Sequence, residues 1–367
     1  MHACRGAAPL TLARASLKDA RLTCAAWRRR QREDSVLVDH RYYHIKPGMV
    51  GAHLDLYEKN GFAPQTRHLG QPLAYMYTES GEVNTLVHVW CYEDAADRAT
   101  KRAAIWLHGT GGASIFDAKR TNGLARELVG RGIAFFPFNN RGAHLLRRLR
   151  KGETRIGGGM AYEIIRDCVL DIDGAVRELR RRGYRELHLV GHSTGANKIA
   201  VYDHYKPRNQ IRRYVLLGGG DDTGLLYAQL GPRRFERALE QARLKMKERR
   251  GHEFVPARIS RMTLSWRSFY DMANPNGDYN VFPFYEVMTG LRLGTRPRFR
   301  HVRAIRKPSL YVYGDRDEFS YDDVPRCVSI LAENVGANAE IVVMEDTDHG
   351  FTGREAELGE LIAWFLD

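Results

Sequence analysis

The chain has 367 residues, a formal net charge of +13 at pH 7, and ordinary fractions of hydrophobic (43%) and charged (28%) residues. This length and composition suit a globular protein with one large and one smaller domain, and no run approaches the ~20 apolar residues that span a bilayer. The arginines lie in short, scattered clusters without interleaved aromatic residues. The charge therefore predicts a solvated basic surface, which argues against a nucleic-acid partner but could draw in an anionic substrate.

Residues 1–34 differ from the rest of the chain because they are rich in Arg and Ala and poor in acidic residues. Arg14 and Lys18 interrupt the apolar residues, so the segment lacks the core of a secretory signal. We expect a disordered or poorly defined leader, with organelle targeting as the alternative. Five widely spaced cysteines without a CxxC pair argue against a disulfide framework or a zinc site, and we expect a cytoplasmic protein without metal or cofactor.

Regular patterning begins at about residue 36 and continues to about residue 102 as β-α-β-β-α. The expected elements are a strand at 35–45, a helix at 47–60, the strands 72–79 and 85–92 of a hairpin, and a helix from residue 95. Proline at the first turn and glycine after the last turn are typical helix boundaries, and the second hairpin strand alternates with period two. The segment predicts a small α+β unit.

Several runs in this segment match a known family, namely 41–48, 56–59, 65–70, 84–90 and 92–98. On these residues the segment 36–102 resembles the NIPSNAP family. The resemblance implies a ferredoxin-like unit that commonly pairs into homodimers. The chain departs from the family at about Ala103, where a different pattern begins, so the unit looks truncated.

From Ala103 to the end of the chain, strand-like runs alternate with helices. The expected strands are 103–107, 133–138, 186–190, 214–217, 309–313 and 341–344, and the expected helices 123–130, 167–182, 195–205 and 355–365. Near-continuous apolar strands separated by helices predict an α/β domain over 103–367, with a mostly parallel sheet covered on both faces. The alternation breaks between about 222 and 300, where we expect a helical cap, with a plain surface insertion as the alternative.

The five residues Gly-His-Ser-Thr-Gly at 191–195 follow an expected strand and precede an expected helix. Glycine at 191 and 195 removes side chains where the two elements crowd a sharp turn. The pattern predicts the nucleophile elbow of an α/β-hydrolase, with Ser193 as the exposed nucleophile. The backbone N–H of Thr194, at the start of the helix, is one expected oxyanion donor, and His192 is expected to support the site.

Two residues after later strands complete the expected site. His349 follows the strand 341–344 and is the expected base, while Asp317 follows the strand 309–313 and is the expected acid that orients it. The order Ser193, Asp317, His349 is the order that this fold uses. Asp315, two residues from Asp317, is the alternative acid.

The glycine-rich run 108–112 directly follows the strand 103–107. Glycines there allow the backbone to approach a substrate carbonyl closely. We expect the second oxyanion donor to be the N–H of Thr110 or Gly111.

The runs 138–142, 158–163, 167–172, 191–198 and, in the expected cap, 275–284 carry a second resemblance. On these residues the domain 103–367 resembles a family of α/β-hydrolases related to the fungal fusarinine C esterase. The resemblance implies hydrolysis of carboxylic esters, with a siderophore-type hydroxamate ester as one candidate substrate, although a fold does not fix a substrate.

The sequence therefore predicts a serine esterase that acts on a small-molecule acyl ester through an acyl-enzyme. Two alternatives stay open: a non-catalytic binding or assembly protein that dimerises through the NIPSNAP-like segment, and an acyltransferase on the same fold. The hairpin 72–92 also precedes the strand 103–107 at the place where this fold usually has an antiparallel strand pair, so it could complete the sheet of the larger domain.

Overall fold

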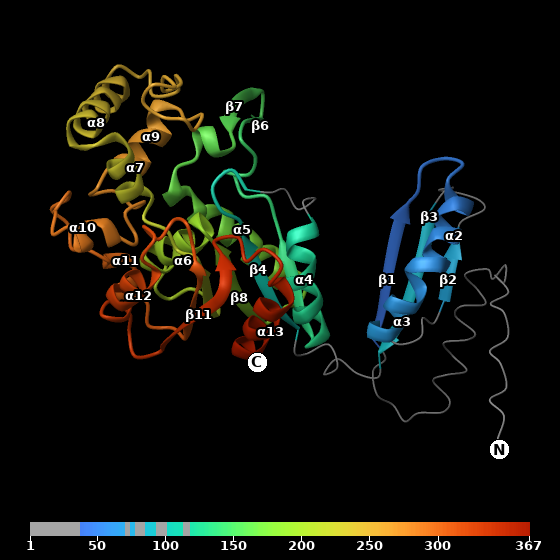
Figure 1. The fold of residues 1–367 in the computed structure, drawn as a ribbon. Helices are drawn as coiled ribbons and strands as arrows, with labels where there is room; N and C mark the ends of the chain where they lie inside the picture. The colour runs from blue at the N-terminus through green and yellow to red at the C-terminus, as the bar shows by residue number, and fades with distance from the viewer. Residues whose placement is uncertain (1–36, 70–73, 78–84, 93–100, 113–117) are drawn as a thin grey trace. The chain divides into compact units, whose positions relative to one another are not determined.

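The computed structural model describes residues 37–69, 74–77, 85–92, 101–112 and 118–367. The chain divides into two compact units, Met1–Thr100 and Lys101–Asp367 (Figure 1). Each unit has its own sheet. The expected leader at 1–34 and the first part of the helix expected from residue 95 lie outside the described residues.

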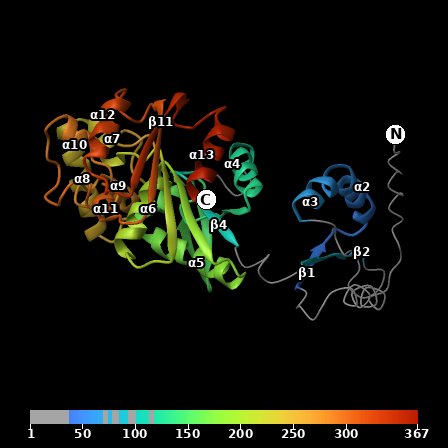
Figure 2. The same ribbon diagram turned by 90° about the horizontal axis from the view of Figure 1, so that it is seen from below.

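The first unit contains a three-stranded antiparallel sheet in the order β1-β3-β2. Its elements are β1 (Leu37–His44), α2 (Val50–Asn60), α3 (Phe62–Leu69), β2 (Ala74–Tyr77) and β3 (Thr85–Tyr92). Both helices lie on one side of the sheet (Figures 1 and 2). Helix α3 was not predicted; its eight residues are too few to show a helical repeat, and Pro64 lies in its first turn, where proline removes no intrahelical hydrogen bond.

The hairpin β2–β3 pairs with β1, from Leu37 opposite Tyr92 to His44 opposite Thr85. The expectation that residues 72–92 complete the sheet of the larger unit is therefore wrong. Strand β4 (Arg102–Leu107) already pairs with β5 on one edge and with β8 on the other, so it has no edge left for a hairpin.

The second unit is built on six parallel strands in the order β11-β10-β9-β8-β4-β5, counted among the described residues. Besides β4 these are β5 (Ile133–Pro137), β8 (Glu186–His192), β9 (Ile211–Leu217), β10 (Ser309–Arg316) and β11 (Ala339–Asp348). Each predicted strand run overlaps one of them. The predicted mostly parallel sheet is confirmed, and its central strands are apolar along their length because both faces are covered.

Helices cover the two faces of this sheet (Figure 2). One face packs against α4 (Ala118–Gly130) and α13 (Glu355–Leu366), and the other against α5 (Cys168–Arg181), α6 (Thr194–Tyr205) and α12 (Val324–Ala332). Successive strand residues alternate between the two cores, so that Leu189 packs with α5 and α6 while Val190 packs with α4 and α13. In α5 a stripe formed by Cys168, Ile172, Val176 and Leu179 is buried.

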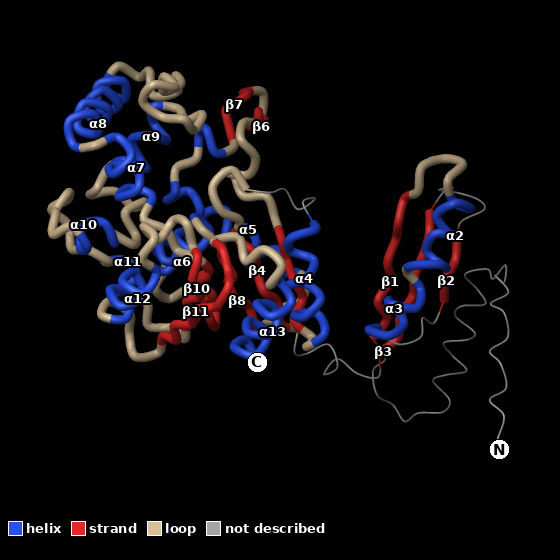
Figure 3. The backbone as a smooth tube through the Cα atoms, viewed as in Figure 1, coloured by secondary structure: helices blue, strands red, loops and turns tan. Residues whose placement is uncertain are grey.

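The segment after β9 is helical over much of the expected insertion at 222–300. It contains α7 (Asp222–Leu230), α8 (Pro232–Lys247), α9 (Trp266–Ala273), α10 (Phe284–Met288) and α11 (Arg300–Ala304). A two-stranded hairpin that the sequence did not predict, β6 (Arg147–Lys151) and β7 (Thr154–Gly158), lies at the same end of the sheet as α7 and α9 (Figure 3). In the described part of the chain, no helix is long and apolar enough to cross a membrane.

Candidate active site

The strand order places two loops side by side at the carboxyl edge of the sheet. From β4 the chain goes to the edge strand β5, whereas from β8 it goes the other way to β9, so the order reverses between the neighbours β4 and β8. In open α/β sheets, ligands bind in the crevice at such a reversal. The loops that follow these two strands are the glycine-rich run 108–112 and the turn at Ser193.

Ser193 occupies a sharp turn between β8 and α6, with φ 57° and ψ −127°. Such a conformation costs a non-glycine residue about 1–3 kcal/mol, so the surrounding structure must hold it. The N–H of Ser193 donates to the carbonyl of Leu217, 2.8 Å away. A Cβ at Gly195 would collide with the carbonyl of Leu107, and one at Gly191 with the carbonyl of Gly195. The structure therefore has the tight strand-to-helix turn that the glycines predict.

His349 and Asp317 form a buried pair. The Nδ1 atom of His349 lies 2.9 Å from both carboxylate oxygens of Asp317, and Asp317 is only 2% exposed. The backbone N–H of Phe319 also donates to Asp317, at 2.9 Å. The alternative acid, Asp315, accepts instead from the backbone N–H of Thr347 at 2.9 Å. Geometry thus places Asp317 on the imidazole.

Two contacts hold this pair beside the turn at Ser193. An ideal Cβ at Gly218, the residue after Leu217, would lie 3.0 Å from Cε1 of His349 and 3.3 Å from a carboxylate oxygen of Asp317. The Nε2 atom of His192 donates to the carbonyl of His349, at 2.7 Å. Gly218, directly after β9, and His192, directly before Ser193, therefore both lie against His349.

The glycine-rich loop lies directly against Ser193. An ideal Cβ at Gly109 would be 2.9 Å from Cβ and 3.4 Å from Oγ of Ser193. The loop turns through a hydrogen bond from the N–H of Gly112 to the carbonyl of Gly109, at 3.1 Å, with Gly111 at φ +61°. Within the described residues, the N–H groups of Thr110 and Gly111 donate to no backbone carbonyl.

Thr194 and Thr110 connect the two loops. Their hydroxyl groups hydrogen-bond to each other, and Thr194 is 1% exposed. As the first residue of α6, Thr194 has an N–H without an intrahelical partner. The three N–H groups predicted as oxyanion donors, from Thr110, Gly111 and Thr194, therefore belong to the two loops that meet at Ser193.

A buried ion pair behind these loops was not predicted. Lys198 Nζ lies 2.5 Å from a carboxylate oxygen of Glu163, and the two side chains are 0% and 4% exposed. Burial and the charge of Lys198 lower the pKa of His108 to about 4, so His108 is neutral at pH 7. Its Nδ1 lies 2.9 Å from the carbonyl of Gly109. Nothing in the spacing of residues 163 and 198 signals that they pair.

The helical insertion also contacts the site loops. The buried Tyr279 hydrogen-bonds to the side chain of Thr110, and the ring of Phe282 lies 2.6 Å from the position of an ideal Cβ at Gly219. A further contact comes from the loop after β10, where the side chain of Glu318 accepts from the backbone N–H of His349 at 3.1 Å. These contacts were not predicted because they join segments that are far apart in the sequence.

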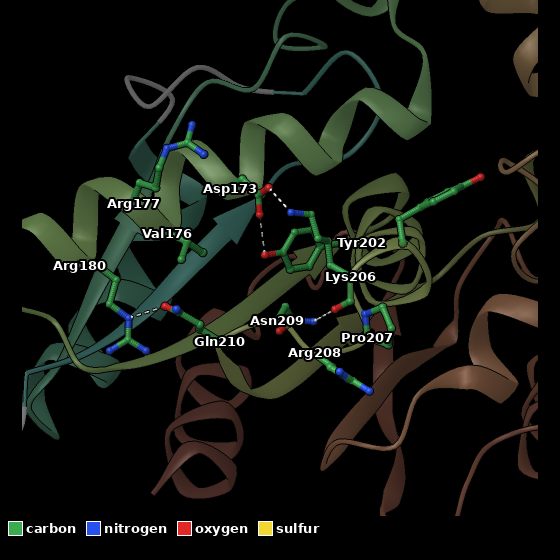
Figure 4. Close-up of a pocket in the computed structure, with 11 residues that line it drawn as sticks. Asp173, Val176, Arg177, Arg180, Tyr202, Lys206, Pro207, Arg208, Asn209 and Gln210 are labelled. Atoms are coloured by element: carbon green, nitrogen blue, oxygen red, sulfur yellow. Dashed lines mark hydrogen bonds and ion pairs between the residues drawn. The ribbon is translucent and has the colours of Figure 1, made fainter.

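A cavity of about 1130 Å³ opens elsewhere on this unit, between α5, α6 and the loop to β9 (Figure 4). Arg177, Arg180 and Arg208 line it, while Lys206 pairs with Asp173 at 2.9 Å. None of the predicted site residues lines this cavity. It lies at the amino edge of the sheet, because β9 begins immediately after its lining residues. The contacts around Ser193, His349 and Asp317, rather than the size of this cavity, mark the candidate active site.

Two family models match the chain: the NIPSNAP family over residues 38–126 and the alpha/beta hydrolase family over residues 104–360. The NIPSNAP match extends beyond the predicted segment 36–102, so the two matches overlap between residues 104 and 126. A comparison with curated proteins gives no match.

Solved structures similar to this chain include the Est1E protein of Butyrivibrio proteoclasticus with bound ferulic acid, at 16% identity and a TM-score of 0.47, over 74% of this chain and 90% of that one. A monoacylglycerol lipase of Paleococcus ferrophilus has 16% identity and a TM-score of 0.46, over 72% and 93%. An esterase of Pyrococcus furiosus has 17% identity and a TM-score of 0.44, over 82% and 92%.

Proposed function

Since the chain belongs to the α/β-hydrolase family, preceded by a NIPSNAP-family segment, we propose that it hydrolyses carboxylic esters with Ser193 as the nucleophile. The observation that carries the proposal is the buried His349–Asp317 pair, joined at 2.9 Å and in contact with the turn that holds Ser193 at φ 57°. A strained serine beside an oriented imidazole is the arrangement that activates a hydroxyl for acyl transfer.

In the proposed reaction, Nδ1–H of His349 donates to Asp317, which leaves Nε2 free to accept a proton. Ser193 Oγ bonds to the acyl carbon and its proton passes to Nε2. The carbon–oxygen bond to the alcohol then breaks, and His349 returns the proton to the departing alcohol. Water, activated by the same imidazole, releases the acid and restores Ser193.

Negative charge on the carbonyl oxygen needs preorganised donors in this mechanism. The N–H of Thr194 and the N–H of Thr110 or Gly111 are the proposed donors. Support comes from the close approach of residue 109 to Ser193, with an ideal Cβ only 2.9 Å from the serine Cβ. No cofactor enters this scheme.

The proposed substrate is a small-molecule acyl ester, and the net charge of +13 favours one with an anionic group. A panel of esters that varies in acyl chain length, with an anionic ester and a hydroxamate ester included, would define the class. We further propose a cytoplasmic location. We also propose a homodimer formed through the NIPSNAP-family segment, and sedimentation of the full chain would test whether the protein is dimeric.

The decisive experiment is covalent labelling with a fluorophosphonate probe, followed by peptide mapping. We expect the wild-type protein to be labelled at Ser193, the Ser193→Ala variant to lose both labelling and ester turnover, and the variant of the exposed Ser329, Ser329→Ala, to keep both. A folded wild-type protein that is neither labelled nor active would overturn the proposal in favour of a binding or assembly role. If Ser193 is labelled and the protein transfers the acyl group to an added alcohol without hydrolysing the ester, the protein is an acyltransferase.

A further inference from the structure

The β6–β7 hairpin and its neighbour Phe254 expose a group of apolar side chains. Leu145, Leu146, Ile156 and Phe254, which we call the hairpin patch, are 54%, 52%, 41% and 47% exposed. Isolated exposed apolar residues need no explanation, but several together mark an interaction surface. The two strands pair only with each other among the described residues, so the hairpin belongs to neither of the larger sheets.

The members of the hairpin patch adjoin the same short stretch of β7 and its end. The ring of Phe254 packs on that of Tyr162, with centroids 5.7 Å apart, and the ring of Tyr162 lies 2.6 Å from an ideal Cβ at Gly157. The Cα of Leu146 lies 3.1 Å from an ideal Cβ at Gly159. Ile156 and Gly157 are consecutive residues of β7, so their side chains point to opposite faces, and the hairpin patch extends over both faces of the hairpin.

The hairpin is also strongly basic. Between residues 147 and 158, five basic residues stand against the single acid Glu153; they are Arg147, Arg148, Arg150, Lys151 and Arg155. The side chain of Arg148 is exposed. Apolar side chains next to an excess of Lys and Arg are the composition of segments that lie in the surface of an anionic bilayer. A symmetric contact with a second copy would bring two such basic hairpins together, which like-charge repulsion opposes.

The hairpin adjoins the predicted oxyanion loop. The N–H of His144, just before the patch, donates to the carbonyl of Gly112 at 3.3 Å. Met160, just after β7, lies with its sulfur 3.1 Å from an ideal Cβ at Gly111. A surface that receives the hairpin patch would therefore lie beside the loops that meet at Ser193.

We propose that the hairpin patch docks the protein on an anionic lipid bilayer, with Leu145, Leu146 and Ile156 entering the boundary between headgroups and acyl chains. The exposed Arg148 contacts the headgroups. This inference extends the proposed ester hydrolysis, because it places a membrane-held acyl ester within reach of the site. The docking itself does not require turnover.

Flotation of the full chain with lipid vesicles tests the proposal. We expect binding to phosphatidylcholine vesicles that contain about 30 mol% phosphatidylglycerol, and binding weaker by about tenfold or more to phosphatidylcholine alone or at high salt. The double variant Leu145→Asp/Leu146→Asp should lose about tenfold or more of the anionic binding. The matched control Leu170→Asp, at a residue of α5 that is 62% exposed, should bind within about twofold of wild type.

The charge contribution is tested separately by Arg148→Glu, which should weaken anionic binding, with Arg208→Glu as the control for the same charge change at another exposed arginine. The Ser193→Ala variant should bind vesicles as wild type does, so loss of the proposed activity and loss of docking are distinguishable. Unchanged cleavage of a soluble short-chain ester by Leu145→Asp/Leu146→Asp would show that this variant is folded.

Three results would overturn the inference. The first is that the wild-type chain does not float with anionic vesicles, and the second is that Leu145→Asp/Leu146→Asp floats as well as wild type. The third is that this variant has a lower mass in solution than wild type, which would show that another copy covers the patch. Ester hydrolysis without vesicle binding would leave the proposed function intact while removing the docking surface.

Discussion

Gly109 allows the loop after β4 to lie against Ser193, and alanine at this position tests whether that loop stabilises an oxyanion. An alanine Cβ would lie 2.9 Å from the Cβ of Ser193 and 3.2 Å from the carbonyl oxygen of His192, whereas carbon atoms in contact rest about 3.5–4.0 Å apart. The loop would have to retreat by roughly 0.6–1 Å. That shift would carry the N–H of Thr110 or Gly111 beyond the range of about 2.7–3.1 Å at which it can stabilise the charge.

Loss of one such donor lowers kcat by about 10²–10³-fold. KM should change little, because the interaction forms only in the transition state. Steady-state kinetics on one ester substrate, with thermal unfolding in parallel, would measure both effects. Gly130→Ala is the matched control, because a Cβ there meets nothing within 4 Å. Wild-type kcat in a folded Gly109→Ala protein would refute the assignment of this loop.

Asp317→Asn should lower kcat by about 10³–10⁴-fold because an amide cannot stabilise the imidazolium, whereas Asp315→Asn should stay within about tenfold in the same kinetic assay. His188, 0% exposed in β8, has its pKa lowered from 6.5 to about 3 by burial and nearby arginines. Because the unfolded chain binds this proton more readily, the contribution of His188 to stability is full above pH 6.5 and is lost as the pH falls toward 3. The free energy of unfolding should fall by about 3 kcal/mol more between pH 7 and 4.5 in wild type than in His188→Leu, measured with urea. Lys198→Met or Glu163→Gln alone should cost about 3–5 kcal/mol in urea unfolding by leaving one buried charge unpaired, and the double variant should recover part of that loss.

Each of these predictions has a result that would contradict it. Equal kcat losses for the two Asp variants would mean that contact with the imidazole does not decide the role of the acid. His252→Leu, which removes an exposed histidine, should leave the acid sensitivity of wild type unchanged, and parallel pH curves for wild type and His188→Leu would refute the burial argument. Additive losses in the double variant would indicate that Lys198 and Glu163 do not stabilise each other.

Much of the fold follows from local sequence features. The strands of the larger unit are apolar runs between helices, and such runs reveal a parallel sheet because both of its faces are buried. The elements that were missed lack this signal. The hairpin β6–β7 is arginine-rich and shows no period-two alternation of apolar residues. Helix α12 has only nine residues, which is too short for a clear helical repeat. Helix α3, with eight residues, is equally short.

The sequence alone predicted the tight turn at Ser193, the strands that precede Ser193, Asp317 and His349, and a change of pattern near residue 102, because glycine spacing and strand ends are local properties of the chain. Only the tertiary structure decided which acid contacts His349, where the hairpin 72–92 pairs, that Lys198 and Glu163 form a buried ion pair, and that the residues flanking the β6–β7 hairpin contact the loop 108–112. These are contacts between residues distant in sequence. Such contacts depend on the order of the strands in the sheet and on which strand edges and side chains remain unpaired after folding. The periodicity of residues along the chain does not specify the strand order or these unpaired groups.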